Sequence, residues 1–200
     1  MNLRSLRSNM TRDSAFRKLS GGRGVARRWL GGELVALAEI YLPYRLYEVT
    51  IQDRGRETRS YHAVDAATGT LDPYEFPAPL EPENFVALDT RNFHPVLLGD
   101  QRTRELAIES VQRSLFTRGF FRLTNPVINA HPVDREFYVP YWAGFYGREQ
   151  NLNLVVLNAV RQTYEGNKLR RLLQSWLIRD SGCATSQSRV EPAISLTRSN

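Results

Sequence analysis

The sequence contains few of the residues that most often carry chemistry. Of its 200 residues, one is cysteine and three are histidine. The lone Cys183 excludes an intramolecular disulfide framework and most cysteine-based metal sites. His62, His94 and His131 have no spacing that would place two of them on one face, and no H-E-x-x-H or C-x-x-C motif is present. The sequence therefore predicts no catalytic residue, no metal ligand and no cofactor.

Long apolar runs are also missing. A membrane-spanning helix needs about 20 consecutive apolar residues. Charge-free stretches such as 137–147 and 150–160 are far shorter and contain polar residues. The first residues lack the apolar region of a secretory signal, and neither a G-x-S-x-G motif nor a P-loop occurs. We therefore expect a non-catalytic, cytoplasmic protein without a transmembrane segment.

What the sequence does contain is an uneven distribution of charge. Lys and Arg total 27 against 21 Asp and Glu, yet residues 1–30 alone sum to +7 and residues 31–180 to −2. A basic segment on a nearly neutral body favours contact with an anionic surface. We expect residues 1–24 to form a disordered or extended basic arm. The candidate contact residues of the basic segment are Arg4, Arg7, Arg12, Arg17, Lys18, Arg27 and Arg28.

The same basic segment has a second interpretation. It is rich in arginine and serine, and Asp13 is its only acidic residue. This composition is typical of an organelle transit peptide. An organelle matrix is therefore the alternative to a cytoplasmic location.

A short motif occurs twice in the chain. E-I-Y-L-P-Y at 39–44 reappears as E-F-Y-V-P-Y at 136–141, and A-V-D-A at 63–66 has a counterpart, V-L-N-A, at 156–159. Each copy predicts an extended aromatic strand, a polar turn and a second apolar strand. We expect two related ββ(α) halves, at about 39–72 and 136–165, that form a pseudo-symmetric antiparallel sheet.

The repeated strands place aromatic side chains on both faces of this sheet. Pro43 and Pro140 mark where each strand enters, because proline cannot donate to the ladder. Alternation then directs Tyr44 and Tyr141 to one face. Either helices cover both faces or one aromatic face is a binding surface. The candidate interaction residues of the opposite face are Arg45, Tyr47, Trp142 and Tyr146.

Apolar periodicity predicts three helices, at about 25–40, 101–118 and 168–179. A proline-rich stretch at 71–95 is expected to run extended over the surface, and residues 181–200 are expected to form a polar tail. The predicted fold class is α+β, with an antiparallel sheet and three packed helices in a single domain at 25–180.

These features favour an interaction or structural module, such as an accessory subunit of a larger assembly. It would dock on a protein partner through the basic arm and the aromatic face. A nucleic-acid-binding module is one alternative, in which the arm contacts phosphates and the aromatic face stacks on bases. A peripheral protein on an anionic membrane surface is another.

Overall fold

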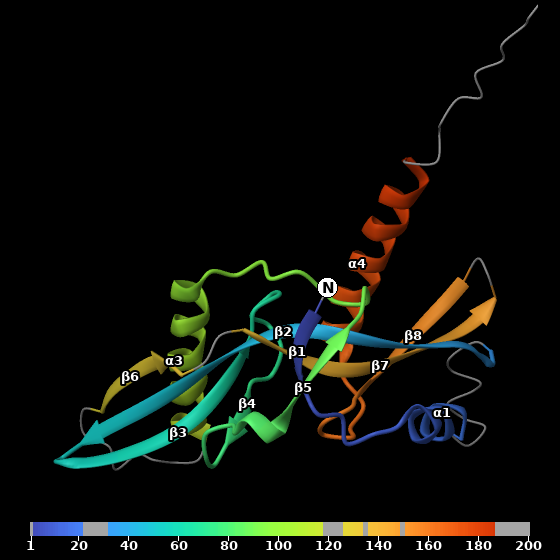
Figure 1. Cartoon of the computed structure of the whole chain (residues 1–200). Helices are drawn as coiled ribbons and strands as arrows, with labels where there is room; N and C mark the ends of the chain where they lie inside the picture. Colours follow the sequence, from blue (N-terminus) through green and yellow to red (C-terminus); the bar gives the residue numbers. More distant parts are fainter. Residues whose placement is uncertain (1, 22–31, 118–125, 134–135, 149–150, 187–200) are drawn as a thin grey trace, which may run out of the picture.

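The computed structural model describes residues 2–21, 32–117, 126–133, 136–148 and 151–186, and within them the fold is α+β. One mostly antiparallel eight-stranded sheet is combined with the helices α1, α3 and α4 (Figure 1). The elements in chain order are β1 (Asn2–Leu6), α1 (Arg12–Ser20), β2 (Leu34–Asp53), β3 (Arg56–Asp65), β4 (Tyr74–Phe76), the 3-10 helix η1 (Pro82–Asn84), β5 (Phe85–Asp89), α3 (Asp100–Thr117), β6 (Val127–Pro132), β7 (Phe137–Arg148), β8 (Asn151–Asn158) and α4 (Asn167–Ser186).

The long strand β2 organises the sheet. Its first half pairs antiparallel with β7, from Leu34 opposite Tyr146 to Tyr44 opposite Phe137. Its second half pairs with β6 on that same edge and with β3 on the other edge. β8 pairs with β7, and the strand order through the centre is β4-β3-β2-β7-β1-β5. Since β6 and β7 are consecutive in the chain, together they follow β2 along most of its length.

The aromatic strands predicted at the two motif copies correspond to β2 and β7, and the predicted helices at 101–118 and 168–179 correspond to α3 and α4. The predicted helix at 25–40 is wrong for residues 34–40, which belong to β2; residues 22–31 lie outside the described part of the chain. Leu34, Leu37 and Ala38 fit helical spacing, but their backbone pairs with β7. A short apolar run without strict alternation, such as residues 34–38, cannot be assigned to a strand or a helix by periodicity alone.

The first residues form part of the folded body. β1 pairs antiparallel with β5, and the Thr11 hydroxyl caps α1 by accepting a hydrogen bond from the Ser14 N–H. The side chains that anchor this segment are all at most 6% exposed: Leu3, Leu6, Met10, Ala15 and Leu19. The predicted disordered or extended arm is therefore wrong for residues 2–20. Cleavage after residue 20 would remove these side chains from the core, and the compartment of the protein stays a prediction.

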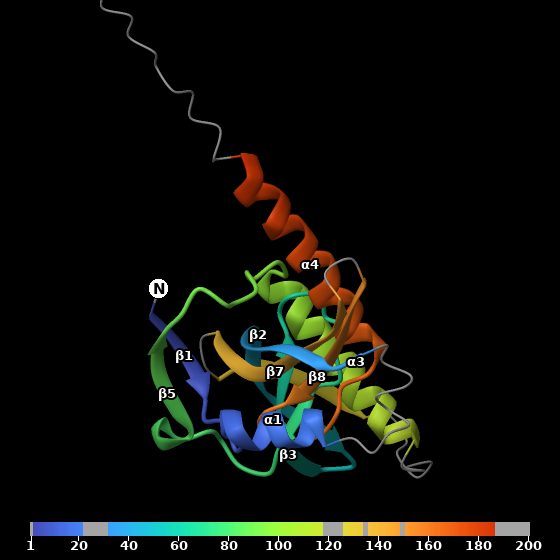
Figure 2. The same cartoon turned by 90° about the vertical axis from the view of Figure 1, so that its right-hand side faces the viewer.

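The three helices cover two faces of the sheet. α1 packs on Trp142 and Tyr146, and α3 packs on Tyr47 and Val49. These side chains alternate with the face that carries Tyr44 and Tyr141, which α4 covers through residues such as Leu173. α1 and α3 lie at opposite ends of β2, while α4 leaves the body and projects outward (Figures 1 and 2). None of the helices in the described ranges is long and apolar enough to cross a membrane.

The proline-rich stretch and the C-terminal tail also differ from the prediction. The proline-rich stretch at 71–95 contains two short paired strands, since β4 pairs with β3 and β5 pairs with β1. Residues 181–186 of the predicted tail continue α4 as helix, and residues 187–200 lie outside the described part of the chain.

Candidate functional site

The four sheet residues singled out in the sequence share one face, as alternation predicts, but that face is covered. Tyr47, Trp142 and Tyr146 are 2%, 7% and 4% exposed beneath α3 and α1, and the Arg45 side chain is 17% exposed. The predicted aromatic docking face is therefore wrong. Its aromatic side chains pack against the two helices instead.

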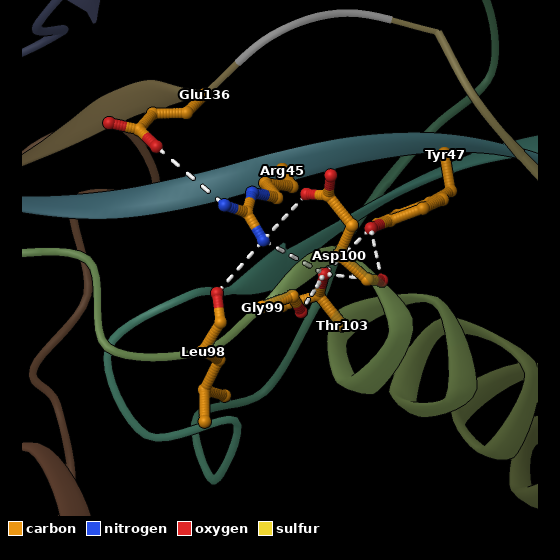
Figure 3. A network of polar contacts seen from close by, with 7 residues as sticks. All are labelled: Arg45, Tyr47, Leu98, Gly99, Asp100, Thr103 and Glu136. Carbon is orange, nitrogen blue, oxygen red and sulfur yellow. Dashed lines mark hydrogen bonds and ion pairs between the residues drawn. The ribbon is translucent and has the colours of Figure 1, made fainter.

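Arg45 is the centre of a polar network at the start of α3 (Figure 3). Its Nη1 lies 2.8 Å from the Asp100 carboxylate and donates a hydrogen bond of 2.8 Å to the Leu98 carbonyl. Its Nη2 lies 3.8 Å from the Glu136 carboxylate, directly before β7. One guanidinium thus joins β2, α3 and β7, which suits its planar set of five donors.

Tyr47 and Thr103 complete the network. Their hydroxyl oxygens lie 2.6 Å apart, and the Tyr47 hydroxyl also donates to the Asp100 carbonyl at 3.2 Å. The Thr103 hydroxyl oxygen lies 3.1 Å from the Gly99 carbonyl oxygen. Burial, more than any neighbouring group, raises the pKa of Tyr47. These side chains hold the first turn of α3 against the sheet.

Trp142 and Tyr146 do the same for α1. The Trp142 indole N–H donates to the Met10 carbonyl at 3.4 Å, and the Tyr146 hydroxyl donates to the Leu19 carbonyl at 2.8 Å. Burial raises the pKa of Tyr146 to about 12. Both ends of α1 are therefore bonded to β7.

A cluster of buried hydroxyls lies on the other face and was missed as a unit in the sequence. The Tyr44 and Tyr141 hydroxyl oxygens lie 3.0 Å apart, and the Tyr74 hydroxyl lies 3.4 Å from that of Tyr141. The Asn158 amide donates to the Tyr74 hydroxyl at 2.5 Å and to the Glu165 carboxylate at 2.8 Å. Burial raises the pKa of Tyr44 and Tyr141 well above the usual value, so both phenols stay neutral at neutral pH.

The cations of the N-terminal segment lie on the surface of the folded body and contact neighbouring residues there. The Arg4 guanidinium stacks 3.7 Å from the centre of the Phe85 ring, and Arg7 donates to the Glu83 carbonyl at 2.6 Å. Lys18 donates to the Gln162 carbonyl and lies 5.9 Å from the centre of the Tyr164 ring. These contacts fix the segment on the body.

The remaining basic candidates divide into described and undescribed residues. Arg17 donates to the Asp13 carbonyl within α1 at 3.4 Å, and Arg12 is exposed at the start of α1. Arg27 and Arg28 lie outside the described part of the chain. The described cations lie around β1 and α1, away from the network of Arg45.

Two open grooves were not foreseen in the sequence. One, of about 350 Å³, lies between α1 and the start of β2 and is lined by Arg12, Asp13, Phe16 and residues 34–37. The other, of about 530 Å³, lies between the 69–73 loop, the face of α3 that carries Ser110 and Ser114, and Lys168. The first combines a cation with two large exposed apolar side chains, since Phe16 is 51% and Val35 58% exposed.

The histidines are dispersed. His62 and His94 are 4% and 1% exposed, with ring nitrogens 2.9 Å from the Ser60 hydroxyl and 2.8 Å from the Pro95 carbonyl. Within the described ranges, no group of three or more His, Cys, Asp or Glu side chains is placed to hold a metal ion.

Comparisons with known proteins add no family to this picture. No protein-family model, no curated protein and no solved structure matches this chain.

Proposed function

We propose that this chain is a non-catalytic interaction module, an accessory subunit that docks on a protein partner through the groove between α1 and β2. The observation that carries the proposal is the exposure of Phe16 and Val35 beside the Arg12 guanidinium. Large apolar side chains gathered on a surface are typical of interaction sites.

The use of the polar side chains inside the fold supports this proposal. Arg45, Tyr47 and Trp142 are bonded to the segments that begin α3 and α1. Because these side chains hold the helices on the sheet, we expect a partner to bind exposed residues instead. A module of this kind acts by presenting a surface on a rigid body.

The charge around the groove indicates the chemistry of the partner. Arg12 and Asp13 line the groove, and Arg17 and Lys18 are also exposed on α1. The first residues of β2 pair with β7 on one edge, and among the described strands none pairs with their other edge. An extended segment that carries apolar and acidic side chains would pair with the strand edge that no described strand occupies and would contact the cations.

The test compares two surface variants of the full chain, each of which introduces one negative charge. Val35→Asp changes the groove, and Phe116→Asp is the matched control, because Phe116 is 78% exposed on α3. After crosslinking in cells, the partner recovered with the wild-type chain is purified, and its affinity for each variant is measured. We expect Val35→Asp to weaken binding at least tenfold and the control to leave it unchanged.

Three results would contradict the proposal. These are equal binding by both variants, stronger loss in the control, and elution of the chain from native extract as a free 23.0 kDa monomer. Salt separates the alternatives, because binding to RNA or DNA that neutralises several phosphates weakens steeply with salt. Flotation with anionic liposomes would instead indicate a peripheral membrane protein.

A further inference from the structure

The two copies of the sequence motif lie side by side at the centre of the sheet. Leu42 pairs directly with Val139, which is its counterpart in the other copy. On either side of this pair, Tyr41 lies opposite Pro140 and Pro43 lies opposite Tyr138. Exchanging the two copies therefore reproduces the same pairing. This is the arrangement that a two-fold axis through the Leu42–Val139 pair would produce.

Side chains obey the same relation. Tyr44 and Tyr141 occupy the same place in the motif, and their hydroxyl oxygens meet 3.0 Å apart next to the axis. Their strand partners are Asp65 on β3 and Asn158 on β8. Two residues that correspond in sequence thus meet each other in the core.

The turns after the hairpins repeat the same hydrogen bonds. The Ala66 N–H donates to the Pro43 carbonyl at 2.9 Å, and the Ala159 N–H donates to the Pro140 carbonyl at 3.1 Å. Asp65 accepts from the N–H groups two and three residues further along the chain, at 2.7 and 3.3 Å. Asn158 does the same, at 3.1 and 2.9 Å. Such bonds define an Asx turn, and it occurs at both corresponding positions.

The correspondence extends to the helices, which the sequence did not reveal. Arg45 and Trp142 are counterparts on β2 and β7, and each donates to the carbonyl two residues before a helix begins. These carbonyls are Leu98, before α3, and Met10, before α1. α1 and α3 are therefore docked in the same way.

The segments in front of the helices also correspond. Ser5, ahead of α1, forms a parallel pair with Tyr138, and Phe93, ahead of α3, forms a parallel bridge with Tyr41. Tyr41 and Tyr138 are again counterparts in the motif. Each leading segment thus pairs with the strand of the opposite copy.

We infer that the chain consists of two copies of one unit, residues 2–66 and 90–159, that exchange their leading parts reciprocally. Each unit runs through an extended segment, a helix, a long strand (β2 in the first unit, β6 followed by β7 in the second) and a return strand. α1 of the first unit covers Leu157 of β8 in the second, and α3 of the second unit covers Val64 of β3 in the first. The chain is a two-fold exchanged dimer joined into one polypeptide. The inference is independent of the proposed docking groove.

The exchange defines an interaction surface and its partner. The hairpin face of each unit binds the helix of the other unit, so neither unit covers its own return strand. The two units should therefore remain associated without the covalent link and should not fold apart from each other.

The first test uses the full chain with a specific protease site inserted between Ala78 and Pro79, which are exposed between β4 and η1. After cleavage we expect a 1:1 complex that keeps the mass and the circular dichroism of the uncleaved chain. It should unfold in one transition, with a midpoint that rises with protein concentration, as for an obligate dimer. Release of a folded piece, or two separate transitions, would overturn the inference.

A second test needs no insertion. Leu19→Ala weakens the packing of α1, and Val111→Ala weakens that of α3. We expect Leu19→Ala to accelerate amide hydrogen exchange in β8 at least tenfold and to leave β3 unchanged, and Val111→Ala to do the reverse. If each variant first accelerates exchange in the return strand of its own unit, reciprocal exchange is contradicted.

Discussion

The two helix-docking regions have the same geometry and different chemistry. The α1 end comprises Met10, Leu19, Trp142, Tyr146 and Leu157, and the α3 end comprises Arg45, Tyr47, Val64, Leu98 and Thr103. At the α1 end an indole N–H bonds the helix start from within an apolar cluster. At the α3 end a guanidinium does so, flanked by the carboxylates of Asp100 and Glu136.

This difference shows that the backbone arrangement does not depend on one kind of side chain. Trp142 stabilises the α1 end by burying apolar surface. Salt does not screen this contribution, because it does not depend on charges. At the α3 end the helix also packs on an apolar cluster that includes Val49 and Val111, but its start is bonded by charged groups, and the Asp100 side chain is 89% exposed. Exposed ion pairs contribute little and are weakened by salt. We therefore expect Trp142 to contribute more to the attachment of α1 than Arg45 contributes to that of α3.

Trp142→Ala should have the largest effect. The side chain is 7% exposed, and its removal leaves a cavity beneath α1 together with an unbonded Met10 carbonyl. Loss of a buried Trp costs about 3–5 kcal/mol of unfolding free energy. Guanidinium denaturation monitored by circular dichroism measures it. If Trp142→Ala lost less unfolding free energy than Arg45→Met, the order of the two attachments would be reversed.

Arg45→Met should follow. Methionine keeps the apolar stem of the side chain but removes the bonds to the Leu98 carbonyl and the Asp100 carboxylate. Hydrogen bonds to charged groups contribute about 1.5–3 kcal/mol. The matched control is Arg59→Met on β3, whose side chain is 62% exposed and pairs with Glu57; there we expect less than about 1 kcal/mol. Equal losses in the two variants would show that Arg45 does not anchor α3.

Alkaline pH should act on the α1 end through Tyr146. Its pKa is raised to about 12 in the folded state by burial, against about 10 in an unfolded chain. Above pH 10 the unfolded state therefore releases this proton while the folded state keeps it. The associated stability is complete below pH 10 and is lost as the pH rises toward 12. Tyr146→Phe should lose stability less steeply over this range, in denaturation midpoints measured at successive pH values. An unchanged slope would contradict this.

High salt should have the smallest effect on unfolding free energy, but it tests directly whether the two helix-docking regions differ in their dependence on charge. At about 1 M NaCl the cost of Arg45→Met should shrink by less than about 1 kcal/mol, because only the ion pairs are screened. The cost of Trp142→Ala should not shrink. If both costs fall together, the two ends do not differ in the way proposed.

The sequence predicted the elements whose pattern is local. Ala107, Ile108 and Val111 recur at helical spacing, so α3 was recognised. Leu169, Leu172 and Leu173 recur in the same way, so α4 was recognised. Residues 34–40 were assigned to the wrong class because only pairing with β7 decides between helix and strand there. Residues 2–20 were taken as an arm because their charge outweighed a weaker signal. That signal is the Thr11 cap followed by Ala15 and Leu19, both buried.

The candidate site was predictable in part. Alternation correctly placed Arg45, Tyr47 and Trp142 on one face, but whether that face is open depends on the packing of α3 and α1. The sequence predicted α3 but neither its position on this face nor α1. The groove was not predictable, since Phe16 and Val35 come from elements that were both misassigned. The full extent of the correspondence was hidden as well. The separation of counterparts changes from 88 residues for Ser5 and Phe93 to 97 for the motif tyrosines and 93 for Asp65 and Asn158, so no single alignment offset displays it.

The bond between Tyr44 and Tyr141 has a consequence for how such a chain diverges. Of two hydroxyls in one hydrogen bond, one must donate and the other accept. In a dimer of identical chains the two directions would be equivalent, and every substitution would strike both ends at once. Here Tyr141 has a second neighbour in Tyr74, at 3.4 Å, which makes the two phenols unequal. Within one polypeptide, the two helix-docking regions are encoded by separate codons. A substitution at one region therefore leaves the other unchanged, so Arg45 at one and Trp142 at the other can be selected independently.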